Sequence, residues 1–274
     1  MSGADLGRLK RICVIGDMTG FGRCALAVQL PAICAMGVQA CPLPTAVISA
    51  IPYHDSHYYL DLSDGISDYA NHWTEIGITF DALLAGFMCS SKEIRVITDY
   101  IRRLNPPIVV VDPVMGDGGH LYSKVKGDVL PVMRTLAGLG GVITPNLTEA
   151  CALAGVPYRQ VFTDAELDGL LERLQKLTPG AVIVKSVCLE NDGETLNNIL
   201  LNKGRTTRWA YEPKPGKYHG CGDFFAAALT GGLVLGDSLE DAFLAASQKT
   251  SQAVSITYER GTPPDDGILF ELTL

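Results

Sequence analysis

The sequence contains few positive charges and no cluster of them. It has 274 residues, of which 22 are Lys or Arg and 30 are Asp or Glu, giving a net charge of −8. The nearest approach to a basic run, Lys203-Gly204-Arg205 with Arg208, is short and typical of a solvated turn. Because nucleic acids and anionic membranes are bound by clustered Lys and Arg side chains, the composition argues against both as partners.

The sequence also lacks a long hydrophobic run. Its longest mostly apolar stretch, residues 224–235, is shorter than the ~20 residues that span a bilayer, and Thr230 and two glycines interrupt it. The N-terminal residues contain no apolar segment of the kind found in a secretion signal. We therefore expect a cytoplasmic protein without a membrane partner.

Paired cysteines are absent as well. None of the eight cysteines forms a C-x-x-C motif, although zinc sites and disulfide frameworks usually show such tight pairing. We expect reduced thiols that pack mostly as small hydrophobic side chains. The cysteines are Cys13, Cys24, Cys34, Cys41, Cys89, Cys151, Cys188 and Cys221.

The glycines near the N-terminus do not have the spacing of a dinucleotide site. Gly16, Gly20 and Gly22 do not make up the G-x-G-x-x-G motif, and no second strand ends in a suitable acid ~20 residues later. A dinucleotide-binding oxidoreductase is therefore a weak alternative.

Short apolar runs alternate with helical patterns along the chain. The runs are β-branched and apolar on both faces, as the strands of a covered parallel sheet require. They cover residues 12–15, 108–111, 142–143 and 182–184. With 47% apolar and 19% charged residues, the chain has the composition of a globular protein with a large core.

Amphipathic helices are expected between these strands. One apolar stripe runs from Ile94 to Leu104, and a second runs from Leu167 to Leu177 after the capping box at residues 163–166. Residues 194–202 and 206–212 read as an antiparallel hairpin, followed by helices over roughly 221–236 and 238–257. We predict a single α/β domain over residues 1–274, with a mostly parallel sheet and an antiparallel edge.

Polar residues stand where the predicted strands end. Asp17, Asp112, Thr144 and Lys185 follow the four runs, and Glu149 lies one turn into the next helix. Ligands of doubly wound sheets bind beyond the carboxyl ends of the strands, and acids with a lysine suit a magnesium-bound polyphosphate. A structural explanation also fits: Asp112 begins a turn, and Asn146 with Glu149 caps a helix.

A glycine turn, Gly220-Cys221-Gly222-Asp223, precedes the first of the two long helices. Backbone N–H groups at a helix start are free, which makes an anion site. Taken alone, the turn is more typical of a helix start with an N-terminal acid. An acid inside an anion site is explained if it accepts the proton of a hydroxyl group during phosphoryl transfer.

These residues resemble the motifs of the ribokinase-like superfamily. Residues 220–223 are similar to its G-x-G-D anion-hole motif, and residues 146–149 to its N-x-x-E magnesium motif. Residues 112–117, 144–149 and 184–185 resemble its vitamin-kinase branch, the pyridoxal kinases and hydroxymethylpyrimidine kinases. Residues 15–23, 43–49 and 84–90 look like pyridoxal kinases, and the likeness covers essentially the whole chain.

The resemblance implies a three-layer fold and ATP-dependent phosphorylation of the 5′-hydroxymethyl group of pyridoxal, pyridoxine or pyridoxamine. The alternative within the branch is hydroxymethylpyrimidine (phosphate) kinase activity in thiamine synthesis. A further alternative is a vitamin-binding protein without activity, but the intact Asp223 and Glu149 argue against it. A homodimer and a monovalent cation such as K⁺ are expected from the resemblance alone.

The resemblance also implies roles for single residues. Asp223 is expected to be the base, in an anion hole made by Gly220, Cys221 and Gly222. Asp112 and Glu149 are expected at Mg²⁺ and ATP, and Thr144 and Lys185 at the nucleotide. The residues expected to contact the vitamin are Asp17, Thr45, Tyr53, Phe87 and Asp223.

Three features depart from the motifs or add to them. Asp17 stands where the family has a small polar residue, and an acid there would favour the cationic amine of pyridoxamine or a protonated ring nitrogen. Residues 113–122 are glycine-rich and suit a flap that excludes water. Cys221 is best read as a small filler, and the alternative is a thiolate with a lowered pKa that adds to an aldehyde.

Overall fold

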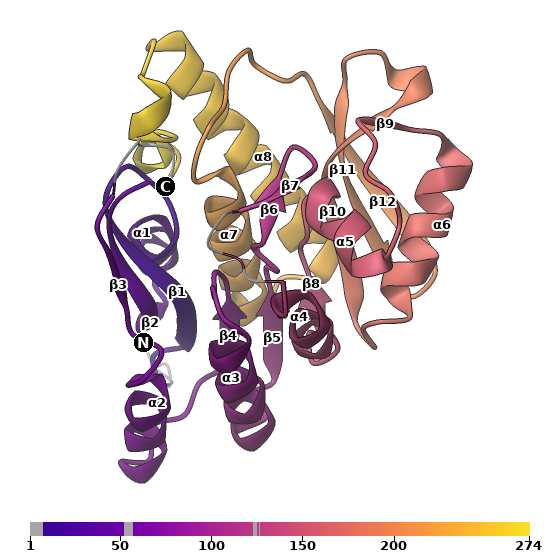
Figure 1. The fold of residues 1–274 in the computed structure, drawn as a ribbon. Coiled ribbons are helices and arrows are strands. Elements are labelled where there is room, and N and C mark those ends of the chain that lie inside the picture. Colours follow the sequence, from indigo (N-terminus) through magenta and orange to yellow (C-terminus); the bar gives the residue numbers. More distant parts are fainter. Residues whose placement is uncertain (1–7, 52–56, 123–124, 126) are drawn as a thin grey trace, which may run out of the picture.

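A mixed sheet organises the computed structural model, which describes residues 8–51, 57–122, 125 and 127–274 (Figure 1). In this part of the chain the sheet has ten strands, in the order β12-β11-β10-β8-β5-β4-β1-β2-β3, with β9 paired to β10. Its strands are β1 (Arg11–Phe21), β2 (Gln39–Ala50), β3 (Tyr59–Asp61), β4 (Ala82–Ala85), β5 (Ile108–Val111), β8 (Val142–Ile143), β9 (Val161–Phe162), β10 (Ala181–Leu189), β11 (Leu196–Asn202) and β12 (Arg205–Tyr211).

The middle of the sheet is parallel and its two ends are antiparallel. Strands β2, β1, β4, β5, β8 and β10 pair in parallel, whereas β3 joins one end and β11 and β12 the other in antiparallel register. The predicted fold class is therefore confirmed, including the hairpin near the C-terminal side.

Helices cover both faces of this sheet. Ile12 and Val14 of β1 pack into one core with α1, α7 and α8, while Cys13 and Ile15 pack into another with α2 to α6. Successive strand residues point to opposite faces, so strands buried on both sides must be apolar throughout. The helices are α1 (Leu26–Ala35), α2 (Ile66–Glu75), α3 (Ser91–Leu104), α4 (Val129–Ala137), α5 (Leu147–Ala154), α6 (Asp164–Gln175), α7 (Cys221–Leu235) and α8 (Leu239–Glu259).

The expected helix and strand boundaries hold in most places. The capping box that opens α6 is present, with the Thr163 side chain accepting from the Glu166 N–H and the Glu166 carboxylate accepting from the Thr163 N–H.

None of the described helices is long and apolar enough to cross a membrane. All eight cysteines are free thiols, as predicted.

Two predicted strand ends are wrong. β1 does not end at Asp17 but continues to Phe21, because β2 keeps pairing with it beyond the last residue paired to β4. β10 does not end at Lys185 but continues to Leu189 along β11. In both strands the register shifts beside the polar residue, between Gly16 and Met18 and between Val184 and Val187. Asp17 and Lys185, which were expected at strand ends, therefore lie at register shifts within longer strands.

The predicted flap is a small hairpin made by β6 (Gly116–Asp117) and β7 (His120–Leu121). Gly118 and Gly119 between its strands have φ values of +59° and +84°, as a tight two-residue turn requires. The Gly119 N–H donates to Thr148 Oγ1 at 2.9 Å. A Cβ atom at position 119 would lie 2.6 Å from the ring of Tyr158. The hairpin is therefore seated on α5 and Tyr158.

This seating can be measured with two alanine substitutions in the same turn. Both Gly118→Ala and Gly119→Ala put a side chain at positive φ, which costs about 1 kcal/mol. Only the side chain at position 119 must also displace Tyr158, because nothing lies within 4 Å of a Cβ atom at position 118. We expect a clearly larger loss of unfolding free energy for Gly119→Ala in urea titrations. Equal losses would mean that the hairpin does not rest on Tyr158.

Candidate active site

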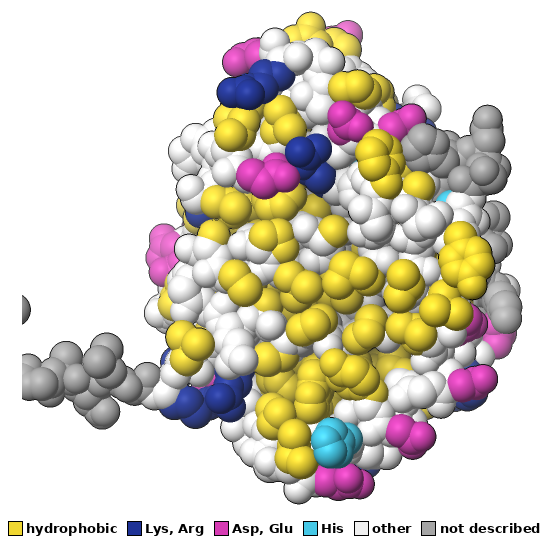
Figure 2. All heavy atoms as spheres, turned by 90° about the vertical axis from the view of Figure 1, so that its left-hand side faces the viewer, with side chains coloured by type: hydrophobic (Ala, Val, Ile, Leu, Met, Phe, Trp, Pro, Cys, Tyr) yellow, Lys and Arg dark blue, Asp and Glu magenta, His cyan; other side chains and the backbone are white. Residues whose placement is uncertain are grey.

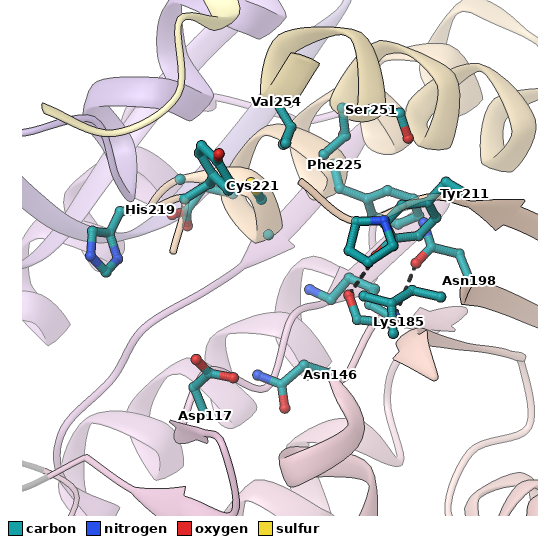
Figure 3. A pocket seen from close by; sticks show the side chains of 18 of the residues that line it. Asp117, Asn146, Lys185, Asn198, Tyr211, His219, Cys221, Phe225, Ser251 and Val254 are labelled. Atoms are coloured by element: carbon teal, nitrogen blue, oxygen red, sulfur yellow. Dashed lines mark hydrogen bonds between the residues drawn. The ribbon is translucent and has the colours of Figure 1, made fainter. Parts of the chain in front are cut away.

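A cavity of about 390 Å³ opens where β5, β8 and β10 meet the N-terminus of α7 (Figure 3). Asp117 and Asn146 lie on one side of it in the figure, and side chains of α7 and α8 lie on the other. Asp112, Glu149, Lys185 and the turn at 220–223 all line it. The structure thus brings together residues that stand far apart in the sequence and were predicted to share one edge of the sheet.

A buried ion pair lies in this cavity. Lys185 Nζ is 2.8 Å from Asp112 Oδ1, and the two side chains are 11% and 2% exposed. The Thr144 hydroxyl donates to the same Asp112 oxygen at 3.0 Å. Burial disfavours the charged lysine, but the carboxylates of Asp112 and Glu149 outweigh this effect and raise the pKa of Lys185. The ammonium therefore stays charged although it is almost removed from water.

A local bulge in β10 puts Lys185 in this place. Ser186 has a φ of +59°, and the register with β11 shifts across this point. The Lys185 N–H donates to Pro145 O at 2.9 Å, and the Ser186 N–H donates to Asn198 Oδ1 at 3.1 Å. A bulge re-aims a side chain without ending the strand. The lysine consequently points past β8 to the acid of β5.

Glu149 performs the predicted capping role. Its Oε2 accepts from the Asn146 N–H at 2.9 Å, and its Oε1 accepts from the Met115 N–H at 3.0 Å. Burial and the nearby Asp112 carboxylate raise the pKa of Glu149 to about 8, against the opposing effect of Lys185. The same carboxyl group closes the start of α5, holds the segment before the flap and faces the cavity.

The glycine turn is shaped by two close approaches. Gly220 has a φ of +86°, and a Cβ atom there would lie 2.4 Å from Arg23 O. A Cβ atom on Gly222 would lie 3.3 Å from Lys185 Nζ and 3.8 Å from Asp112 Oδ2. The first glycine thus permits the turn, and the second lets the start of α7 reach the ion pair. The free N–H groups of the first turn of α7 lie beside this pair.

Asp223 lies partly buried in the first turn of α7. Its Oδ1 accepts from Gln29 Nε2 at 3.4 Å, and the Ala25 N–H also bonds to its carboxylate. Burial raises the pKa of Asp223 to about 7, the charges of Asp112 and Asp17 add to the shift, and the Ala25 N–H and Lys185 oppose it. A carboxyl group with a pKa near neutrality is suited to exchanging protons at physiological pH.

Cys221 does not carry an activated thiol. Burial, together with the charge of Asp223, raises the pKa of Cys221 to about 12. The lowered pKa considered from its position at a helix start is therefore wrong, because the loss of hydration outweighs the effect of the helix N-terminus. The thiol is neutral and fills space in the motif.

Of the residues predicted to contact a vitamin, Asp223 lines this cavity, whereas Asp17, Thr45 and Phe87 do not. Asp17 is buried and accepts from Thr19 Oγ1 at 2.7 Å, and burial raises its pKa. The Thr45 hydroxyl donates to Phe87 O at 3.0 Å. Asp17 is nevertheless close enough to raise the pKa of Asp223. Tyr53 lies outside the described residues.

Several residues of the site were missed in the sequence. Gln29 does not line the cavity but bonds to Asp223; it belongs to an apolar helix and gave no motif. Ser247, Ser251 and Ser255 line the cavity from α8, and their spacing of four residues is a polar stripe that could have been read as a binding face. Tyr211 and Asn198 of the antiparallel hairpin also line it.

The donor set fits magnesium held together with a polyphosphate. In the described part of the chain no group of three or more His, Cys, Asp or Glu side chains is arranged to hold a metal ion alone. Mg²⁺ usually takes one or two protein carboxylates and completes its shell with phosphate oxygens and water. Asp112 and Glu149 could supply such carboxylates, and Lys185 with the start of α7 could supply positive charge for phosphates.

A comparison with known protein families identifies the family of this chain. Residues 28–265 match the model of the family described as phosphomethylpyrimidine kinase. The chain belongs to the phosphomethylpyrimidine kinase family. The predicted relationship to pyridoxal kinases is confirmed, because relatives of this chain carry that name.

Two curated relatives carry the name pyridoxal kinase. A Saccharomyces cerevisiae protein named as a candidate pyridoxal kinase is 31% identical over 160 residues, covering 55% of this chain and 50% of the relative. Pyridoxal kinase PdxY of Rubrobacter xylanophilus is 32% identical over 189 residues, covering 66% of this chain and 63% of the relative. The chain thus spans about half the length of the first relative and somewhat more of the second.

A solved structure is similar over nearly the whole chain. A Bacteroides thetaiotaomicron protein named as a candidate phosphomethylpyrimidine kinase is 34% identical, with a TM-score of 0.92 over 99% of this chain and 94% of that chain. A second crystal form of it, with pyridoxal, gives 33% identity and a TM-score of 0.89 over 97% of this chain and 94% of that chain. The ribokinase-like fold predicted from the motifs is confirmed.

The buried acid should make stability depend on pH. The pKa of Asp223 rises from its ordinary 3.8 to about 7 on folding, so charging it in the folded protein costs stability increasingly between these two values. We expect Asp223→Asn to raise the unfolding free energy at pH 8, by about 4 kcal/mol at most. The gain should shrink as the pH falls towards 4. Urea unfolding at several pH values measures it, and a pH-independent difference would contradict the raised pKa.

Proposed function

We propose that the protein is a pyridoxal kinase, which transfers the γ-phosphoryl group of ATP to the 5′-hydroxymethyl group of a B6 vitamer. The observation that carries the proposal is the position of one acid, Asp223, at the start of α7 and beside a buried lysine–aspartate pair. In phosphoryl transfer the protein mainly positions the reactants and stabilises charge. This arrangement supplies a proton acceptor and positive groups at one place.

The proposed reaction assigns one step to each group. Asp223 accepts the proton of the hydroxymethyl group. The hydroxymethyl oxygen bonds to the γ-phosphorus of ATP while the bond between that phosphorus and the leaving ADP breaks. The free N–H groups of Gly220, Cys221 and Gly222 stabilise negative charge on the transferred group. Lys185 and Thr144, both bound to Asp112, hold the nucleotide side of the cavity.

Magnesium bound with ATP would supply further positive charge, and Asp112 and Glu149 would hold it. The cavity and its surroundings contain four carboxyl groups, Asp17, Asp112, Glu149 and Asp223, against one buried lysine. This excess of acids is unusual in a buried site and suits a partner that brings a cation. A requirement for K⁺ stays a prediction from the family resemblance.

Hydroxymethylpyrimidine kinase activity is the second candidate. The matching family model is itself described as phosphomethylpyrimidine kinase, whereas the curated relatives in yeast and Rubrobacter carry the name pyridoxal kinase. Both reactions phosphorylate a hydroxymethyl group on an aromatic nitrogen ring, so the same base and anion hole serve either. The vitamin side of the site, including Asp17, decides between them.

Release of ADP with different acceptors tests the proposal. We expect turnover with pyridoxal, pyridoxamine or pyridoxine and much less with hydroxymethylpyrimidine. Asp223→Asn should lose about a thousandfold in kcat, as expected for the loss of a general base, and should retain ATP binding. A preference for hydroxymethylpyrimidine would establish the second candidate. No ADP release with any acceptor would exclude both.

The rate should also depend on the ionisation of Asp223. A base works only when it is deprotonated, so kcat/KM for the vitamer should fall about tenfold per pH unit below a pKa near 7. The measurement is a pH profile between pH 5 and 9 with a stability check at each pH. A flat profile across pH 6 to 8 would contradict the base assignment.

The expected homodimer stays a prediction, and one surface suits it. Figure 2 shows apolar side chains gathered on the side of the molecule that carries the β1–β3 end of the sheet. Phe21, Val47 and Leu60 are exposed on these three strands. Contiguous apolar surface framed by polar residues is typical of an interface between proteins. We propose that a second copy of the chain covers it.

Light scattering after gel filtration tests the pairing. Val47→Asp combined with Leu60→Asp should convert a dimer into a monomer that keeps its far-UV circular dichroism. Val161→Asp is the matched control, because Val161 is also exposed but lies on β9 towards the other end of the sheet. A monomeric wild type, or a dimer that survives the double change, would contradict the assignment.

A further inference from the structure

Gln29 is a buried amide whose oxygen has no partner. It lies in α1 with 1% of its surface exposed, and its Nε2 donates to Asp223 Oδ1 at 3.4 Å. Its Oε1 is fully buried and accepts no hydrogen bond from any described residue. Buried polar side-chain atoms normally have a partner, and one that lacks it needs an explanation. The explanation offered by its position is the acid beside it.

The amide lies beside two glycines. A Cβ atom on Gly16 would lie 3.9 Å from Gln29 Oε1, and a Cβ atom on Gly86 would lie 3.6 Å from Gln29 Nε2. Neither glycine places a side chain against the amide. A rotation of 180° about the last side-chain bond exchanges the oxygen and the nitrogen without moving α1.

The helix itself is anchored on Asp223 at a second point. Ala25, directly before α1, has a φ of +50°, which is rare for a residue other than glycine. Its N–H bonds to the Asp223 carboxylate, and its carbonyl oxygen accepts from the N–H of Gln29 at 3.0 Å. The backbone thus fixes the distance between Gln29 and the acid, and only the amide remains free to change its orientation.

Asp223 needs different partners in its two protonation states. A carboxylate only accepts hydrogen bonds, whereas a carboxylic acid also donates one. The charged and titratable groups that face it are Asp112 from β5, Asp17 from β1, Lys185 from β10 and the thiols of Cys24 and Cys221. Lys185 and the Ala25 N–H can only donate, and no hydrogen bond joins Asp223 to Asp112 or Asp17 in the described part of the chain, whereas the Gln29 amide already bonds to it.

We propose that Gln29 is a positioning residue that follows the protonation of Asp223. Its amide N–H donates to the carboxylate before the reaction. Once the proton of the substrate hydroxyl group has passed to Asp223, the turned amide accepts that O–H through Oε1. The proton then leaves to water, and the amide turns back. The catalytic part of this inference rests on the proposed kinase function, whereas the pairing of Gln29 with Asp223 does not.

Loss of the amide should make Asp223 a weaker donor of its proton. A hydrogen bond to the carboxylate favours the ionised form, so its removal raises the pKa of the acid. Gln29→Met keeps the length of the side chain and removes both amide groups. We expect the pKa of Asp223 to rise by about one pH unit, which matches the strength of one hydrogen bond to a charged group.

The experiment follows the acid directly and then through the rate. Carboxyl ¹³C NMR of the nucleotide-free protein, assigned by the signal lost in Asp223→Asn, gives the pKa in wild type and Gln29→Met. The pKa that limits kcat/KM on the acidic side of the pH profile should rise by the same amount. At pH values below that pKa, kcat/KM should therefore be about tenfold lower than in wild type. The KM for ATP should stay unchanged.

Gln175→Met is the matched control. Gln175 Nε2 donates to Thr178 O at 3.1 Å and to Gly180 O at 2.8 Å, away from the cavity. This substitution also removes a structural amide, so it should lower the thermal midpoint while the Asp223 signal and the pH limb stay in place. A purely structural role of Gln29 would give the same result in both variants.

Gln29→Glu provides a second, isosteric variant. Two neighbouring carboxyl groups cannot both ionise easily, so the pKa of Asp223, or of the pair that titrates together, should rise further than in Gln29→Met. Either variant decides the question if the other fails to fold. An unchanged pKa in a folded variant overturns the inference. A shifted pKa in a protein that phosphorylates no vitamer would overturn the proposed function and leave the pairing standing.

Discussion

The ion pair between Lys185 and Asp112 connects the elements that build the site. It joins β10 to the end of β5, and Thr144 after β8 bonds to the same oxygen. Removing one partner of a buried ion pair leaves an uncompensated charge without water. The pair itself is favourable only with good geometry and further hydrogen bonds. The bulge at Ser186 and the missing side chain of Gly222 provide that geometry. The start of α7 can approach the pair only because of both.

Asp223 acquires its chemistry from this arrangement. The helix start that carries it is held on one side by the ion pair and on the other by the backbone of residues 23–25. The acid consequently loses part of its hydration, and this loss raises its pKa. A surface aspartate in the same sequence context would be ionised at all pH values near neutrality. The tertiary packing, and not the motif, gives Asp223 a pKa near neutrality, as the proposed base requires.

The sequence predicts the sheet and the residues that meet at its edge. Apolar runs buried on both faces leave little choice but a covered parallel sheet, and the carboxyl ends of parallel strands must lie together. The extension of β1 and the continuation of β10 were not predictable in the same way. Each depends on a neighbouring strand, β2 or β11, that goes on pairing after a register shift. Local sequence shows a polar residue but not which partner lies beside it.

Side-chain environment was harder to predict than position. Cys221 was placed correctly, yet its ionisation follows from burial that no motif shows. Gln29 was missed because an amide in an apolar helix has no signature until the helix is docked on Asp223. Both residues show that hydrogen-bond partners and hydration come from tertiary contacts. Sequence motifs predict only those residues whose role depends on the turn or helix end in which they lie.

The two sides of the site rest on different parts of the fold. The proposed nucleotide side is built from β5, β8 and β10 in the middle and on one flank of the sheet, where each residue is tied to backbone or to another charged group. The proposed vitamin side lies on the extension of β1 and on β2, beyond the last residue that pairs with β4. Residues such as Asp17 can therefore differ without disturbing the ion pair or the start of α7. A family that carries two substrate names on one fold is what this separation would allow.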